Sequence, residues 1–200
     1  MNRPTALLLF CLACTCGLAP CLLAQGDAPT LLRLNGATLD HQQTAMKLLG
    51  GYALVNIAGG LALRAGSTGS ARYFYEMNAL WNTVNLGIAG FGYLASLKAD
   101  PAAWTLTEGL RENQQFAKIL LFNAGLDVGY LMGGLYLRER ARRPEANGER
   151  LTGFGNAILL QGGFLLVFDL VNYFVANGRG RELELLIGPV GEGLGLRLQF

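Results

Sequence analysis

The chain has 200 residues, of which 52% are hydrophobic, 15% are charged and 28 are glycine, and its formal net charge is +2. Soluble domains usually carry about 25% charged residues. The composition therefore excludes a disordered tail, a basic nucleic-acid-binding protein and a disulfide-rich secreted scaffold. It indicates an integral membrane protein whose main partner is the lipid bilayer.

Residues 1–24 have the parts of a secretory signal peptide. Arg3 gives a basic start, residues 6–19 form an apolar core, and Ala24 is a small residue at the expected cleavage site. A lipoprotein signal is the alternative, although Pro20 stands where that signal needs a small residue before Cys21. All four cysteines lie in this segment, so the mature chain would have no disulfide, thiol nucleophile or cysteine metal ligand.

Four windows that are free or nearly free of charge predict four transmembrane helices. They cover about residues 46–64, 76–97, 117–138 and 153–177. About 20 helical residues cross the hydrocarbon layer, so the last three windows are long enough. The first is shorter, and Lys47 and Arg64 can extend it by reaching toward the head groups. We therefore predict an all-α membrane protein with a four-helix transmembrane domain over residues 46–177.

A transmembrane β-barrel is the alternative fold. Barrel strands alternate between apolar and polar residues. Residues 158–160 and 164–168 are continuously apolar, so the pattern favours helices.

Two segments outside these helices complete the predicted organisation. Residues 25–45 form an N-terminal extracytoplasmic segment, in which Thr38 is the expected N-cap of a helix that starts near His41. Residues 178–200 alternate between apolar and polar side chains on either side of a glycine-proline turn, which predicts a β-hairpin. A lone hairpin is marginally stable, so it would lie against the bundle, the membrane surface or a protein partner.

Basic residues predict the orientation. They are about twice as dense in loops 64–76 and 138–152 as in the other connecting segments. This places both loops in the cytoplasm and both termini outside, in the inner membrane of a bacterial cell. Four arginines in the second loop carry most of the bias, and they are a topology anchor or a site for anionic lipids. They are Arg138, Arg140, Arg142 and Arg143.

Polar residues inside the windows are the candidate site residues. Asn78, Asn82 and Asn85 share one helix face, which must turn away from lipid. Their role is interhelical hydrogen bonding or the lining of a polar path. The remaining polar candidates are Asn123, Asp127, Tyr130, Gln161, Asp169 and Asn172.

Asp127 and Asp169 are the most informative of these residues. A carboxylate in the bilayer is costly, so each must be paired, protonated or in contact with water. The third helix also carries a stripe of small residues, Gly125, Gly129 and Gly133, which predicts close helix packing within the bundle or with a second copy.

Three longer strings resemble a known family. They are YFYEMNALWNTVNL at 73–86, LFNAGLDVGY at 121–130, and LQGGF at 160–164 with FD at 168–169. Together they are similar to a domain-of-unknown-function family of small bacterial multi-pass membrane proteins. The resemblance implies a membrane protein and supplies no activity.

Catalysis finds little support in the sequence. His41 is the only histidine, and the predicted topology separates it from Ser67 and Ser70. We predict no catalytic set, no metal site and no cofactor. The first functional hypothesis is a non-enzymatic membrane scaffold or assembly protein that could self-associate. The second is a small transporter or proton- or ion-conducting protein that uses Asp127 and Asp169.

Overall fold

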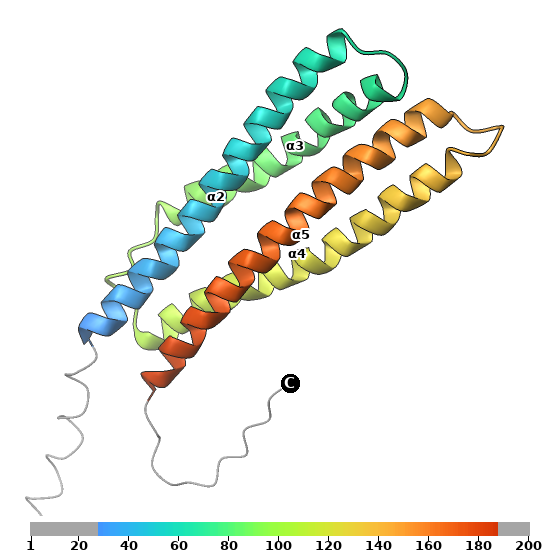
Figure 1. Ribbon diagram of the computed structural model, residues 1–200. Coiled ribbons are helices and arrows are strands. Elements are labelled where there is room, and N and C mark those ends of the chain that lie inside the picture. The colour runs from blue at the N-terminus through green and yellow to red at the C-terminus, as the bar shows by residue number, and fades with distance from the viewer. Residues whose placement is uncertain (1–27, 188–200) are drawn as a thin grey trace, which may run out of the picture.

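The computed structural model describes residues 28–187, which form four long α-helices (Figure 1). They are α2 (Ala28–Ala65), α3 (Gly69–Ser96), α4 (Leu106–Arg140) and α5 (Gly148–Leu185). Successive helices run antiparallel, so the α2–α3 and α4–α5 connections lie at the same end of the bundle. The all-α, four-helix prediction is therefore confirmed.

Local sequence signals set where the helices begin. Thr105 precedes α4 in a capping box: its hydroxyl accepts from the backbone N–H of Glu108 at 3.3 Å, and its backbone N–H donates to the Glu108 carboxylate at 2.8 Å. The Asn147 side chain accepts from the Arg150 backbone N–H at 3.2 Å and caps α5. At the start of α3, Gly69 has φ +57, a conformation that glycine adopts without a Cβ clash.

The helix α2 begins well before the predicted start near residue 46. Thr38 was predicted to cap this helix, and that prediction is wrong because Thr38 is buried inside α2 and its hydroxyl donates to the Leu34 carbonyl at 3.0 Å. His41 also lies within the helix. Leu34, Leu39 and Ala45 are buried, so apolar packing extends the helix back to Ala28.

The predicted C-terminal hairpin is wrong where it can be compared. The hairpin was expected to begin at residue 178, but α5 continues to Leu185, and no strand occurs between residues 28 and 187. Leu183 is fully buried in the bundle, and Glu182 pairs with Arg33 of α2 at 3.3 Å. These tertiary contacts favour the helix over the local alternation. Residues 188–200, like the predicted signal peptide, lie outside the described residues.

Three helices, α2, α4 and α5, are long and apolar enough to cross a membrane. Four such helices were predicted, but α3 is not among those apolar enough to cross a membrane. It carries Asn78, Asn82 and Asn85 among its apolar residues. Large apolar side chains cover the outside of the bundle: Val55 is 73% and Phe91 79% exposed. An apolar exterior of this kind is typical of a surface that faces lipid.

Glycines allow the helices to approach closely at a few positions. A Cβ on Gly60 of α2 would lie 2.9 Å from the Tyr75 carbonyl oxygen of α3. In the second hairpin, a Cβ on Gly134 would lie 3.0 Å from the Gly155 carbonyl oxygen. Gly153 brings α5 against the backbone of α3, where a Cβ would lie 2.8 Å from the Phe74 nitrogen. The contacts at Gly60 and Gly134 pack the two helices of each hairpin together, and the contact at Gly153 joins the two hairpins into one bundle.

The predicted small-residue stripe lies elsewhere on α4. Gly125, Gly129 and Gly133 are exposed, and a Cβ on any of them would meet nothing within 4 Å. They therefore pack against no other helix in the described part of this chain. Packing of the stripe against a second copy stays a prediction.

Candidate functional site

Buried polar side chains are concentrated inside the bundle. Six of the residues predicted to face inward are at most 5% exposed: Asn78, Asn82, Asn85, Asp127, Gln161 and Asp169. In an apolar environment each of these groups needs a hydrogen-bond partner or a bound species. Together with neighbouring polar residues they form three regions along the bundle: a central cavity, an amide network on one side of it, and a group around His41 on the other.

The central region is a cavity of about 150 Å³ between the helices. Asp127 of α4 and Asp169 of α5 line it together with Asn85, and Leu49 and Leu165 are among its apolar walls. A space of this size can hold several water molecules, each of which needs polar partners. Polar groups from three helices supply such partners within otherwise apolar surroundings.

Two half-buried residues predicted from the sequence also reach this cavity. Asn123 and Tyr130 line it from α4. The Tyr130 ring meets the Trp81 ring edge to face, with centroids 4.8 Å apart, and Trp81 is itself part of the lining. The aromatic pair thus bridges the α3 and α4 walls of the cavity.

The two carboxyl groups in the cavity are direct neighbours. Asp127 is 2% exposed and Asp169 is 5% exposed, and each interacts with the other's carboxyl group. The Oδ2 atom of Asp127 has no hydrogen-bond partner among the described residues. Two negative charges so close together in a low-dielectric interior repel each other strongly. The pair therefore needs a proton or a cation to be stable there.

A hydrogen-bonded amide network extends from the cavity toward the α2–α3 connection. The Asn85 amide donates to Asn82 Oδ1 at 3.4 Å, and the Asn82 amide donates to the Asn78 carbonyl at 2.8 Å. Asn78 is the centre of this network because its amide donates to Asn56 Oδ1 at 2.8 Å and its Oδ1 accepts from Gln161.

Tyr52 completes the network on α2. Its hydroxyl donates to Gln161 Oε1 at 3.1 Å, and its ring stacks on Phe164 with centroids 3.5 Å apart. Gln161 is therefore held by both Tyr52 and Asn78. Nearer the α2–α3 connection, Arg64 of α2 forms a salt bridge with Glu76 of α3 at 3.0 Å.

On the other side of the cavity, the polar residues continue to a histidine. Asn172 lies one turn beyond Asp169 on α5, and its Oδ1 lies 2.9 Å from His41 Nε2. The guanidinium of Arg179 lies 3.3 Å from His41 Nδ1. Because arginine can only donate, Nδ1 accepts and Nε2–H donates to Asn172. The hydrogen bonds thus assign a neutral His41 of defined tautomer.

Sequence reasoning placed Asn172 near Asp169 but missed the contacts of His41 with Asn172 and with Arg179. The sequence carried no signal for these contacts, because the helix was expected to end at residue 177, whereas α5 continues past it and aligns Arg179 with His41 of α2. Within residues 28–187, no group of three His, Cys, Asp or Glu side chains could hold a metal ion. Two buried carboxyl groups with amide and phenol neighbours can hold a proton.

Comparison with known families supplies the wider context. A family model described as a family of unknown function, DUF6992, matches residues 48–170. The chain belongs to this family. The matched segment includes every residue that lines the cavity, from Leu49 to Asp169, and the DUF6992 match ends before Asn172 and Arg179. No curated protein and no solved structure matches the chain.

Proposed function

We propose that this protein is a small membrane protein that binds and conducts protons through the interior of its helical bundle. The observation that carries the proposal is the buried pair of carboxyl groups, Asp127 and Asp169, in one cavity, where Asp127 Oδ2 accepts no hydrogen bond from residues 28–187. Ionisable residues of this kind in membrane helices commonly belong to proton or ion pathways.

The arrangement of polar groups supports conduction rather than isolated proton binding. Asn172 and His41 lie on one side of the acid pair, and the network centred on Asn78 lies on the other. Side chains of these types donate and accept hydrogen bonds, so with water they can pass a proton along. In this mechanism Asp127 and Asp169 share the transported proton, and neutral His41 exchanges it with the adjacent interface.

A scaffold role is the second candidate function. In the sequence, two features favour it: the glycine stripe and the predicted C-terminal hairpin. Because α5 continues to Leu185, where the hairpin was expected, the hairpin no longer supports this role. The observation that still favours a scaffold is the exposed stripe of Gly125, Gly129 and Gly133, which could receive a helix of a second copy.

The proposed orientation is testable by chemical labelling. We propose that the α4–α5 connection is cytoplasmic and the end of α5 is not, since the basic residues are concentrated near that connection. Pro144 and Arg181 are exposed at opposite ends of the bundle. An impermeant thiol reagent applied to intact spheroplasts is expected to label Arg181→Cys and not Pro144→Cys. Labelling of Pro144→Cys alone would reverse the proposed orientation, and the unsubstituted chain controls for native cysteines.

Proton flux into liposomes tests the proposed function. The wild-type protein is expected to acidify liposomes that contain a trapped pH-sensitive dye when a potassium diffusion potential is applied. Asp127→Asn and Asp169→Asn should each reduce the flux by at least about tenfold, because an amide keeps the shape but cannot carry the proton. Asp100→Asn is the matched control: Asp100 is exposed in the α3–α4 connection, and its Oδ1 accepts from the Ala102 backbone N–H.

Folding of each variant is monitored by circular dichroism and thermal unfolding. Normal folding with loss of flux in both cavity variants, and normal flux in Asp100→Asn, supports the proposal. A wild-type protein that gives no flux above protein-free liposomes contradicts it. Unchanged flux in the cavity variants also contradicts it and leaves the scaffold role favoured.

A further inference from the structure

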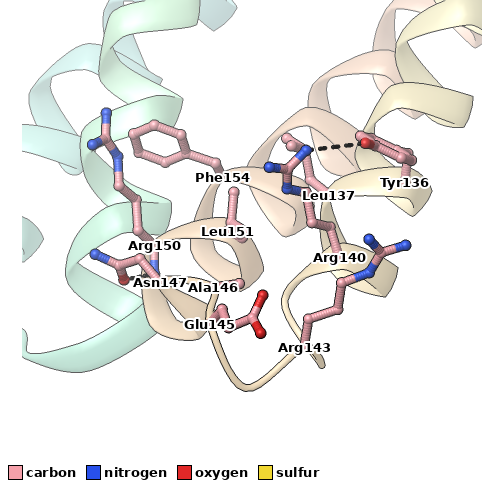
Figure 2. A pocket seen from close by; sticks show the side chains of 10 residues that line it. All are labelled: Tyr136, Leu137, Arg140, Arg143, Glu145, Ala146, Asn147, Arg150, Leu151 and Phe154. Atoms are coloured by element: carbon pink, nitrogen blue, oxygen red, sulfur yellow. Dashed lines mark hydrogen bonds between the residues drawn. The ribbon is translucent and has the colours of Figure 1, made fainter.

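A second site, far from the acid pair, lies at the end of the α4–α5 hairpin. It is a pocket of about 620 Å³, formed by the last turns of α4, the connection after it and the first turns of α5 (Figure 2). Figure 2 shows Arg140 and Arg143 on the α4 side and Arg150 on the α5 side, with Glu145 in the connection between them. Three guanidinium groups thus line one pocket together with a single carboxylate.

The three arginines of the pocket have no carboxylate partner within the described residues. Arg140 donates to the Tyr136 hydroxyl at 3.2 Å, and the guanidinium of Arg150 lies 5.1 Å from the centre of the Phe154 ring. Neither contact neutralises a positive charge. The neighbouring Arg142 differs, because it pairs with Glu139 at 2.9 Å and does not line the pocket. The pocket therefore keeps a net positive charge that a bound anion would balance.

The start of α5 adds partial positive charge to this region. Asn147 lines the pocket and caps the helix by accepting from the Arg150 backbone N–H, so the pocket lies at the N-terminus of α5. The helix dipole stabilises negative charge at such a position. Guanidinium groups are also well suited to paired hydrogen bonds with phosphate oxygens.

The position of the pocket along the bundle points to a lipid as the source of the phosphate. The apolar windows of α4 and α5 meet the charged residues at this end, which is the level of the head groups if these helices cross the bilayer. Tyr136, which lines the pocket, is of a residue type that is enriched at this level, and Leu137, Leu151 and Phe154 add apolar surface. A phosphate bound to the arginines would thus leave its acyl chains beside the apolar surface of the hairpin.

We propose that this pocket binds the phosphate of an anionic phospholipid head group. The site is independent of proton conduction, since it shares no residue with the cavity of Asp127 and Asp169. It makes the basic loop a specific lipid site, in which Arg140 and Arg143 contact the phosphate and Arg150 adds positive charge from the opposite wall. Glu145 opposes binding and so limits the affinity.

Native mass spectrometry of the detergent-purified full chain tests this site. Titration with phosphatidylglycerol should give tighter binding than titration with phosphatidylcholine. Arg140→Gln and Arg143→Gln should each weaken phosphatidylglycerol binding about fivefold, whereas Glu145→Gln should strengthen it. Arg142→Gln removes the same charge from the same loop but not from the pocket, so its binding should stay within about twofold of wild type.

Three results would overturn the assignment. Equal weakening by Arg142→Gln and Arg143→Gln would show general attraction to the basic loop. Equal binding of both lipids would show that the phosphate site does not select anionic lipid. Competition by inorganic phosphate as strong as competition by phosphatidylglycerol would identify free phosphate as the ligand. All substituted side chains are exposed, so unchanged thermal unfolding should accompany each variant.

Discussion

Gly153→Ala is expected to lower the free energy of unfolding by about 3 kcal/mol, at the upper end of the usual cost of overpacking. The added Cβ would overlap the Ser70 carbonyl oxygen and would lie 2.7 Å from Tyr73 Cβ and 2.8 Å from the Phe74 nitrogen. Two of these three atoms belong to the backbone of α3 and cannot turn away as a flexible side chain would. The α3 and α5 helices must therefore separate, with loss of contacts along their interface.

The measurement is reversible unfolding in detergent micelles, monitored by circular dichroism. Gly163→Ala is the matched control, because Gly163 lies on the same helix and an added Cβ would meet nothing within 4 Å. Alanine is favoured over glycine in a helix by up to about 1 kcal/mol, so this control should be neutral or slightly stabilising. Equal effects of the two substitutions would contradict the close approach of α3 and α5 at Gly153.

Asn78→Leu is expected to destabilise the bundle by about 2–4 kcal/mol. The substitution leaves the Gln161 amide and Asn56 Oδ1 without their partner, and each buried unsatisfied group costs about 1–3 kcal/mol. Thr83→Val on the same helix is the control. Thr83 is exposed and its hydroxyl bonds only to the Ala79 carbonyl within α3, so its loss should cost less than about 0.5 kcal/mol.

A double substitution separates the network from simple packing loss. Gln161→Met removes the group that Asn78→Leu leaves unpaired, so the two substitutions together should cost less than the sum of their separate effects. Residues in one hydrogen-bond network usually show coupling of about 0.5–3 kcal/mol. Strict additivity in the same unfolding assay would contradict a direct role for the Asn78–Gln161 bond.

Helix type, number and apolar character could be predicted because they depend on local sequence. Windows without charge predicted four helices near their observed positions, and the asparagines of α3 predicted its inward face. Helix ends were harder to predict. Thr38 resembles an N-cap in isolation, and residues 183–187 resemble a strand, yet burial of Leu34 and Leu183 extends both helices past these signals.

Contacts between helices depend on their rotation and axial offset, which no local pattern reports. The glycines at 125, 129 and 133 have regular spacing but face outward, whereas Gly134, one residue further on, meets Gly155. Successive residues of a helix point in directions about 100° apart, so Gly133 can face outward while Gly134 faces α5. Sequence reasoning could rank such stripes as candidates but could not decide which one the neighbouring helix would meet.

The sequence by itself determined that this chain forms apolar helices with a few polar residues that must turn inward, because charge and hydropathy are properties of each segment. Only the tertiary structure decided that Asp127 and Asp169 share a cavity and that His41 meets Asn172 and Arg179. These groups lie on different helices, and the order of the helices and their axial offset bring them together. The candidate site is thus a product of packing between segments whose separate characters the sequence already contains.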